Sequence, residues 1–246
     1  MKSSTKNIFF ELCTETLEAA RAAAAAGAHR IELCSDLACG GITPSLDLLA
    51  ADFRSFDIPV HVLIRPRDGD FIFSSHEFQL MIHQVEQAKR AGAAGVALGV
   101  LLPDGRVDVE RTRELVHLAR PMSVTFHRAF DETPDLAEAL ERVIQTGADY
   151  LLTSGGAPDV LRGAEVIASL AKQAGGRIHI IAGGGLRLAT LAQVVRRSGL
   201  FSLHGSLTHE NGAAPSAENQ QMLGAAVRQA IQLLSAEYQE ITAPIR

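Results

Sequence analysis

Short runs of β-prone apolar residues recur along the chain, and each run is followed by a longer stretch with helical periodicity. The runs begin near eight positions: Ile8, Arg30, Val60, Val96, Ser123, Tyr150, Ile178 and Phe201. Successive starts are about 28 residues apart, which is the length of one β-strand followed by one α-helix. Eight such units in a chain of 246 residues predict a (β/α)8 barrel, a single α/β domain that covers residues 1–246.

Capping residues sharpen the expected helix ends. An Ala-rich helix is predicted over residues 15–26, with Thr14 as its N-cap and Gly27 after its last turn. Pro44 suits the first turn of the second helix, with Thr43 before it as the cap.

Composition narrows the class of protein. The chain is 47% hydrophobic and 21% charged, and it has no apolar run near the roughly 18 residues of a membrane-spanning helix. We therefore expect a soluble protein without a membrane partner. The N-terminus has no secretory pattern and the three cysteines are an odd number, so a reducing, cytoplasmic setting is favoured over a disulfide framework. A net charge of -5 without a long basic run argues against a nucleic-acid partner.

Polar residues stand in phase at the ends of several predicted strands. Side chains of a strand alternate between faces, and in a parallel barrel the outer face is apolar, so these polar residues are expected to point into the barrel at its C-terminal mouth. They are Glu11, Cys13, Glu32, Cys34, Arg65, Arg67, Thr125, His127, Ser202, His204 and Ser206. This end of the barrel is where active sites of the fold lie.

The carboxylates allow two interpretations. Glu11, Glu32 and His127 are the catalytic candidates if the protein is an enzyme, because they could move protons. Alternatively, Glu11 and Glu32 pair with Arg65, since buried carboxylates need partners.

The tripeptide Glu-Leu-Cys occurs at residues 11–13 and again at 32–34. If the two strands are neighbours, the thiols of Cys13 and Cys34 come within reach of one soft ion. Paired thiolates near an imidazole favour Cu(I) or Zn(II) over hard cations. Cys39, in the following loop, is a possible third ligand.

Glycine loops after the seventh and eighth strands predict an anion site, because barrels bind phosphate with backbone N–H groups at this place. The anion-binding candidates are Arg65, Arg67, Thr153, Ser154, Gly183, Gly184, Gly185 and Ser206. Asp70, Arg128, Asp131 and His204 are expected to complete the mouth. The alternative is that the glycines only make a tight turn from strand to helix.

Five motifs in order resemble the CutC family, which is associated with copper homeostasis. They are Glu32–Cys34, Gly40–Ser45, Ile64–Phe71, Thr125–Asp131 and Leu152–Gly155. The resemblance implies a cytoplasmic (β/α)8 barrel that forms homo-oligomers, a dimer being favoured, and that binds Cu(I) through Cys13 and Cys34. One departure is Phe73, which stands where the family usually has an aromatic hydroxyl.

Three functions therefore remain open from the sequence. The first is Cu(I) binding in copper homeostasis. The second is an enzyme that acts on a small phosphorylated or carboxylated metabolite. The third is a barrel that binds a ligand without catalysis.

Overall fold

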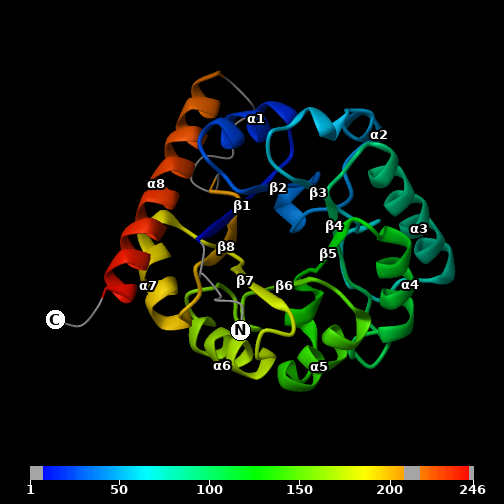
Figure 1. Ribbon diagram of the computed structural model, residues 1–246. Coiled ribbons are helices and arrows are strands. Elements are labelled where there is room, and N and C mark those ends of the chain that lie inside the picture. Colours follow the sequence, from blue (N-terminus) through cyan, green and yellow to red (C-terminus); the bar gives the residue numbers. More distant parts are fainter. Residues whose placement is uncertain (1–7, 208–216, 244–246) are drawn as a thin grey trace.

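The eight strands form a closed parallel barrel in the order of the sequence (Figure 1). The structure is a computed structural model, and it describes residues 8–207 and 217–243. The strands are β1 (Phe9–Thr14), β2 (Arg30–Leu33), β3 (Val60–Leu63), β4 (Gly95–Leu98), β5 (Ser123–Phe126), β6 (Tyr150–Thr153), β7 (His179–Gly183) and β8 (Ser202–Gly205). Each begins within one residue of its predicted position, which confirms the (β/α)8 prediction.

Helices surround the barrel as an outer ring (Figure 1). They are α1 (Leu17–Ala25), α2 (Leu46–Leu49), α3 (Ser75–Arg90), α4 (Val109–Ala119), α5 (Leu136–Thr146), α6 (Ala164–Ala174), α7 (Leu188–Ser198) and α8 (Ala217–Thr242). Three 3-10 turns, η1 (Leu37–Cys39), η2 (Phe53–Ser55) and η3 (Arg128–Glu132), lie in the connections. Helix α8 packs beside α7 and α1 and so closes the ring.

Two predicted caps were wrong. Helix α1 is capped by Thr16, whose hydroxyl accepts from the N–H of Ala19, because Thr14 still belongs to β1. Helix α2 is a single turn capped by Ser45. The Thr43 hydroxyl is used elsewhere: it accepts from the N–H of Arg65 at 2.8 Å and donates to Gln84 at 3.0 Å. Thr43 therefore fastens its loop to the end of β3 and does not start the helix.

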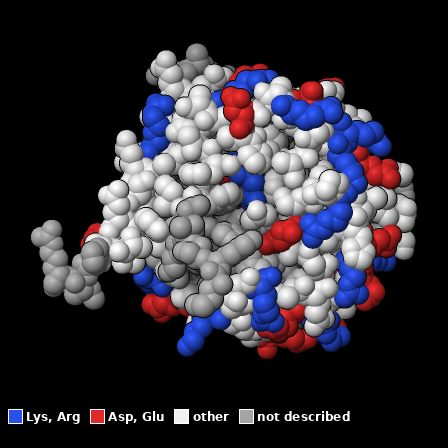
Figure 2. All heavy atoms as spheres, in the orientation of Figure 1, with Lys and Arg blue, Asp and Glu red and all other residues white. Residues whose placement is uncertain are grey.

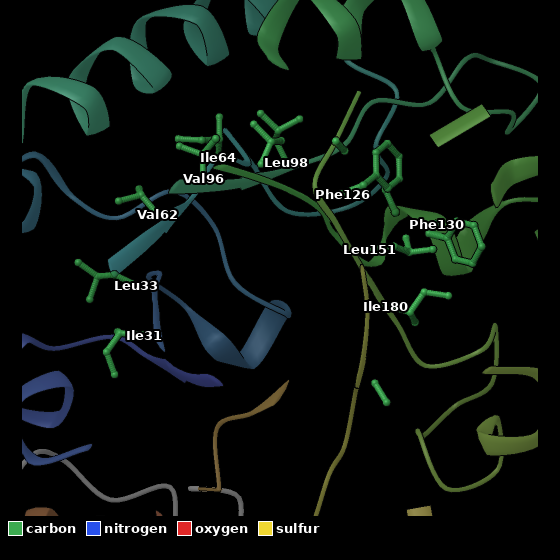
Figure 3. Close-up of a cluster of buried hydrophobic side chains, with 14 of the residues drawn as sticks. Ile31, Leu33, Val62, Ile64, Val96, Leu98, Phe126, Phe130, Leu151 and Ile180 are labelled. Carbon is green, nitrogen blue, oxygen red and sulfur yellow. The ribbon is translucent and has the colours of Figure 1, made fainter. Parts of the chain in front are cut away.

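The main core lies between the barrel and the helices. Outward-facing strand residues such as Leu33, Val62, Val96 and Leu151 pack there (Figure 3). A smaller cluster lies inside the barrel and consists of Cys13, Cys34, Leu63 and Ala97. The alternation of faces thus follows the predicted phase, with the leucine of each Glu-Leu-Cys copy outside and its cysteine inside.

The strands are staggered, as closure of a barrel requires. Cys13 lies opposite Glu32 in the register of β1 and β2, and Glu11 lies opposite Arg30. On the other side of β1, Glu11 lies opposite His204 of β8. The two copies of the tripeptide are therefore offset by two residues, and this offset brings thiol, carboxylate and imidazole to one level of the barrel.

Charges of both signs are interspersed around the periphery of the face drawn in Figure 2. Many of them form exposed ion pairs, such as Arg177 with Glu141 and Arg120 with Asp149. No helix within the described ranges has the length and hydropathy needed to cross a lipid bilayer.

Candidate functional site

A cavity of about 720 Å³ opens at the carboxyl ends of the strands. Its walls come from the strands β1, β2, β3, β6 and β8 and from the loops that follow β2, β3, β4, β5, β7 and β8. This volume lies in the range of small-molecule sites in proteins. The lining residues separate into two walls of different chemistry.

The first wall, called the thiol wall, consists of Cys13, Cys34, Glu32 and His204. The two sulfur atoms lie 3.4 Å apart and carry no disulfide. Cys13 also contacts Glu32, with 3.5 Å between Sγ and Oε1. Cys13 lines the cavity, whereas Cys34 lies behind it with no solvent exposure.

A buried ion pair lies directly beneath the thiol wall. The Arg30 guanidinium donates to Glu11, and the Nδ1 of His204 donates to the same carboxylate at 2.7 Å. Burial alone would raise the pKa of Glu11, but Arg30 and His204 together hold that pKa well below its usual range. Glu11 is therefore ionised and its carboxylate is shared between two donors.

The second carboxylate behaves in the opposite way. Burial raises the pKa of Glu32, and the nearby charge of Glu11 raises it further against the opposing effect of His204 and Arg30. Its Oε2 atom is buried without a hydrogen-bond partner in the described structure. For His204, burial alone would lower the pKa, but the hydrogen bond to Glu11 and the charges of the two glutamates raise it.

Three groups of the thiol wall have the geometry of metal ligands. One ligand atom from each of Cys13, Glu32 and His204 lies within 4.8 Å of the other two, and all three residues are buried. The pKa of the Cys13 thiol is raised, first by its hydrogen bond with Cys34 and then by burial. A metal would therefore have to displace protons from this wall.

The second wall, called the donor wall, consists of Arg65, His127 and Phe71. The guanidinium of Arg65 lies over the ring of Phe71, with 4.7 Å from Cζ to the ring centroid, and the rings of Phe71 and His127 have centroids 5.0 Å apart. Arg65 and His127 are 6% and 5% exposed. Burial, together with the charges of Arg65 and Arg128, lowers the pKa of His127 to about 3.

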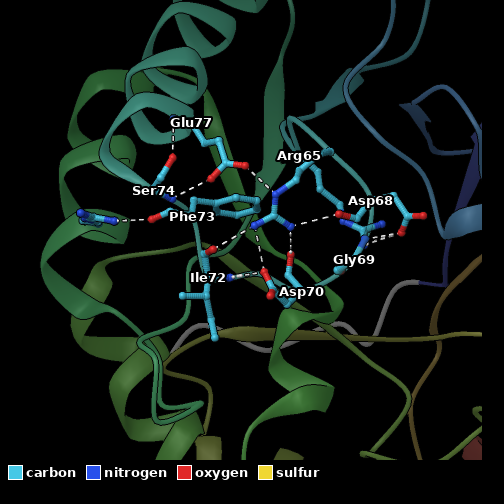
Figure 4. Close-up of polar contacts among 10 residues, drawn as sticks. Arg65, Asp68, Gly69, Asp70, Ile72, Phe73, Ser74 and Glu77 are labelled. Carbon is cyan, nitrogen blue, oxygen red and sulfur yellow. Dashed lines mark hydrogen bonds and ion pairs between the residues drawn. The ribbon is translucent and has the colours of Figure 1, made fainter.

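Arg67, two residues after Arg65, does not line the cavity. Its guanidinium donates to Glu77, to Asp70 and to backbone carbonyls, and it thereby ties the loop after β3 to the capping box at the start of α3. Figure 4 labels its partners Glu77, Asp70 and Ile72. Asp70 does line the cavity, but its carboxylate accepts from Arg67. The donors of Arg67 are therefore already used, which leaves none for the predicted anion-binding role.

The Asp131 carboxylate accepts hydrogen bonds from the hydroxyl groups that were expected to bind an anion. It accepts from the hydroxyls of Thr153 and Ser154 at 2.5 and 3.0 Å and from the backbone N–H of Gly156 at 3.0 Å. Arg128 donates to the same carboxylate at 2.8 Å. This side of the mouth is held together by one buried carboxylate, and neither Thr153 nor Ser154 lines the cavity.

Only part of the predicted glycine site borders the cavity, and this part is called the glycine edge. Gly184, Gly185 and Ser206 line it, whereas Gly183 lies within β7 and does not. Gly184 has a φ of +108°, and a Cβ there would stand 3.0 Å from Ser154 and 3.1 Å from Arg128. Only glycine fits this close approach of the two loops.

The expected pairing of Glu11 and Glu32 with Arg65 was wrong. Arg65 donates instead to the carbonyls of Cys39, Gly41 and Gly69, and the partner of Glu11 is Arg30. In the sequence, Arg30 stands out only as the start of a predicted strand. Its position offered the missed signal, because residues 30, 32 and 34 share one face of β2 and Arg30 must point into the barrel with Glu32.

The fold and the mouth place the chain among the (β/α)8 barrels whose ligands bind at the carboxyl ends of the strands. The chain belongs to the CutC family, whose model matches residues 8–209. A family protein CutC from Chromobacterium violaceum is 46% identical over 196 residues, which cover 80% of this chain and 79% of that protein. One from Caulobacter vibrioides is 40% identical over 222 residues, covering 90% and 89%.

Solved structures agree with the family. A structure of CutC from Streptococcus agalactiae, described as a candidate copper homeostasis protein, superposes with a TM-score of 0.76 and 28% identity. It covers 81% of this chain and 99% of its own. N-(5'-phosphoribosyl)anthranilate isomerase from Pyrococcus furiosus, at 15% identity and a TM-score of 0.56, shares the fold alone.

Proposed function

We propose that this protein binds Cu(I) through Cys13 and Cys34 and serves copper homeostasis in the cytoplasm. The observation that carries the proposal is the pair of unbridged sulfur atoms, 3.4 Å apart, at the inner end of a cavity. Soft thiolate ligands select Cu(I) over hard cations. The candidate copper homeostasis role of the related Streptococcus agalactiae protein supports the same role here.

The surroundings of the two sulfurs suit a cation. Cys13 borders the cavity, which gives an ion a route to the thiols, and the carboxylate of Glu32 and the imidazole of His204 are close enough to add a further ligand. The thiols must lose their protons when a metal binds, so binding is expected to release protons and to strengthen as the pH rises.

Competition for Cu(I) tests the proposal. The reduced protein is titrated without oxygen against a chromogenic Cu(I) chelator, beside Cys13→Ser and Cys34→Ser. The parent is expected to withdraw Cu(I) from the chelator, and each variant is expected to lose that ability, because a hydroxyl is a poor ligand for a soft ion. If both variants compete as well as the parent, the thiols are not the ligands.

A parallel titration with Zn(II) decides which ion the wall prefers. Cys13, Glu32 and His204 offer the mixed sulfur, oxygen and nitrogen ligands that zinc accepts. Zn(II) binding that depends on Glu32 and His204 but not on Cys34 would replace the copper proposal by a zinc site.

The homodimer implied by the family resemblance is tested on the same material by light scattering.

A further inference from the structure

Unpartnered polar atoms are concentrated at the cavity. In the described part of the chain, five buried side-chain nitrogen or oxygen atoms lack a hydrogen-bond partner, and three of them belong to residues that line this cavity. They are Glu32 Oε2, Arg65 Nε and His127 Nε2. Burying a polar group without a partner costs stability, so a cavity that gathers three of them is built to receive a ligand.

Arg65 is held rigidly and still has a donor to offer. Its terminal nitrogens donate to the carbonyls of Cys39, Gly41 and Gly69 at 2.7 to 3.0 Å, which joins the loop after β2 to the loop after β3. These bonds fix the plane of the guanidinium and leave Nε–H unused. Among the described residues, the positive charge has only a loose ion pair with Asp68, whose carboxylate oxygen lies 3.8 Å from Nη2 on a side chain that is 71% exposed.

His127 offers a second fixed donor beside it. The Nδ1 atom accepts from the backbone N–H of Ala129 at 3.2 Å, so the neutral ring carries its proton on Nε2. Phe71 contacts both side chains, which keeps the imidazole and the guanidinium on one wall. The two residues line the cavity, and each keeps one unpartnered N–H donor, that of Arg65 being cationic.

We infer that Arg65 Nε and His127 Nε2 together bind the carboxylate of a small organic acid whose apolar body occupies the rest of the cavity. This inference is independent of the proposed copper site, since it uses neither Cys13 nor Cys34 and no other residue of the thiol wall.

The chemistry favours a carboxylate over a phosphate. Two single donors match the two oxygens of a carboxylate, whereas the other donors of Arg65 are already engaged. Asp68, Asp70 and Glu132 also line the cavity, and their charges would repel a doubly charged phosphate more strongly than a monoanion.

The remaining lining suits an apolar body. Leu63, Leu101, Leu152 and Ile72 face the cavity beside Phe71. A volume of about 720 Å³ is larger than the carboxylate alone requires. We therefore expect an acid with an aliphatic or aromatic chain.

Matched probes test the inference on the full chain. Protein labelled with ¹⁵N in arginine and histidine is titrated with 3-phenylpropionate, with its neutral amide 3-phenylpropanamide and with phenyl phosphate, while the N–H signals are followed by NMR. The Arg65 and His127 signals are assigned from their absence in Arg65→Lys and His127→Phe. The acid is expected to shift both signals, and the amide is expected to bind at least about tenfold more weakly because it lacks the charge.

Variants locate the site. His127→Phe keeps a ring against Phe71 but removes Nε2–H, and it should weaken binding of the acid by about tenfold. Arg197→Gln removes an exposed cation of α7 that does not line the cavity, and it should alter the affinity by no more than about twofold. Arg128→Gln removes the cation at the glycine edge and reports on a phosphate site there.

Four results overturn the inference. They are equal binding of acid and amide, unchanged affinity in His127→Phe, binding of phenyl phosphate alone with loss in Arg128→Gln, and no shift of either signal by the acid at millimolar concentrations. The third result would place a phosphate site at the glycine edge. The comparison of acid with amide uses the parent protein, so it stands even if a variant fails to fold.

Discussion

The thiol wall and the donor wall use their polar groups in different ways. On the thiol wall, side chains of β1, β2 and β8 contact one another, and directly beneath it Glu11 lies between Arg30 and His204. On the donor wall, Arg65 and His127 bond to the backbone of neighbouring loops. The first arrangement joins side chains of three strands, whereas the second joins side chains to the backbone of the loops after β2, β3 and β5.

The difference also concerns the charge that each wall can accept. Thiol, carboxylate and imidazole groups converge on the thiol wall, so a cation is its natural ligand. The donor wall presents N–H groups and a positive charge, so an anion is the ligand that it lacks. The two proposed sites thus lie on walls of opposite chemistry in one cavity.

Glu11→Gln should have the largest effect on this contrast. The change removes the charge that compensates Arg30, which is 3% exposed, and an uncompensated buried charge destabilises a protein by about 3–5 kcal/mol. Urea unfolding at neutral pH measures the loss. His204 loses its ionised acceptor in the same variant, so the thiol wall should lose order together with stability.

Glu141→Gln is the matched control, because it breaks an ion pair with Arg177 on the exposed helical surface. Its effect on the free energy of unfolding should be far smaller, since solvent screens that pair. Similar losses of unfolding free energy in the two variants would mean that the buried network contributes no more to stability than an exposed ion pair. Restored stability in Glu11→Leu combined with Arg30→Met would show that the network is replaceable by apolar packing.

The two mouth histidines should respond to pH in opposite directions. The pKa of His127 is lowered from 6.5 to about 3 in the folded state, so the unfolded chain binds the extra proton as pH falls through that window. Its contribution to stability is therefore lost on acidification, by about 1.4 kcal/mol per pH unit below 6.5. The pKa of His204 is raised, so its contribution is present below 6.5 and is lost as pH rises through the folded value.

Unfolding in urea across this pH range checks both signs. His127→Gln should flatten the loss on the acid side, and His204→Gln should remove the loss above pH 6.5. His83→Gln, an exposed histidine of α3, provides the control for a histidine without burial. An unchanged acid slope in His127→Gln would contradict the burial argument for the donor wall.

Much of the fold could be predicted because periodicity is local. Each strand start depends on a few apolar residues, and Gly27 follows the last turn of α1 as predicted, with a positive φ of 96°. Thr43 failed as a cap because its hydroxyl bonds to Arg65, and that contact joins residues 22 positions apart. A local signal cannot reveal a distant competitor for the same hydroxyl.

Contacts between residues far apart in the sequence also limited what could be predicted of the candidate site. The phase of the strands placed Cys13, Glu32 and His204 in the barrel, but the stagger between β1 and β2 decided that Cys13 lies opposite Glu32. Arg65 and Arg67 share a phase and a loop, yet one lines the cavity with a free donor and the other is consumed by Glu77 and Asp70. Only the partners of each guanidinium distinguish them.

Cys39→Ser should have the smallest effect, and it shows how far the thiol wall extends. The Cys39 sulfur donates to the carbonyl of Asp36 at 3.1 Å, within its own turn, and the side chain is partly exposed. A serine hydroxyl can make the same bond, so the free energy of unfolding should change by no more than about 0.5 kcal/mol. Competition for Cu(I) should also be unchanged, in contrast to Cys13→Ser and Cys34→Ser. A loss of Cu(I) binding in Cys39→Ser would mean that the loop after β2 folds over the wall to supply a third sulfur, and the copper site would then span both the barrel and its cover.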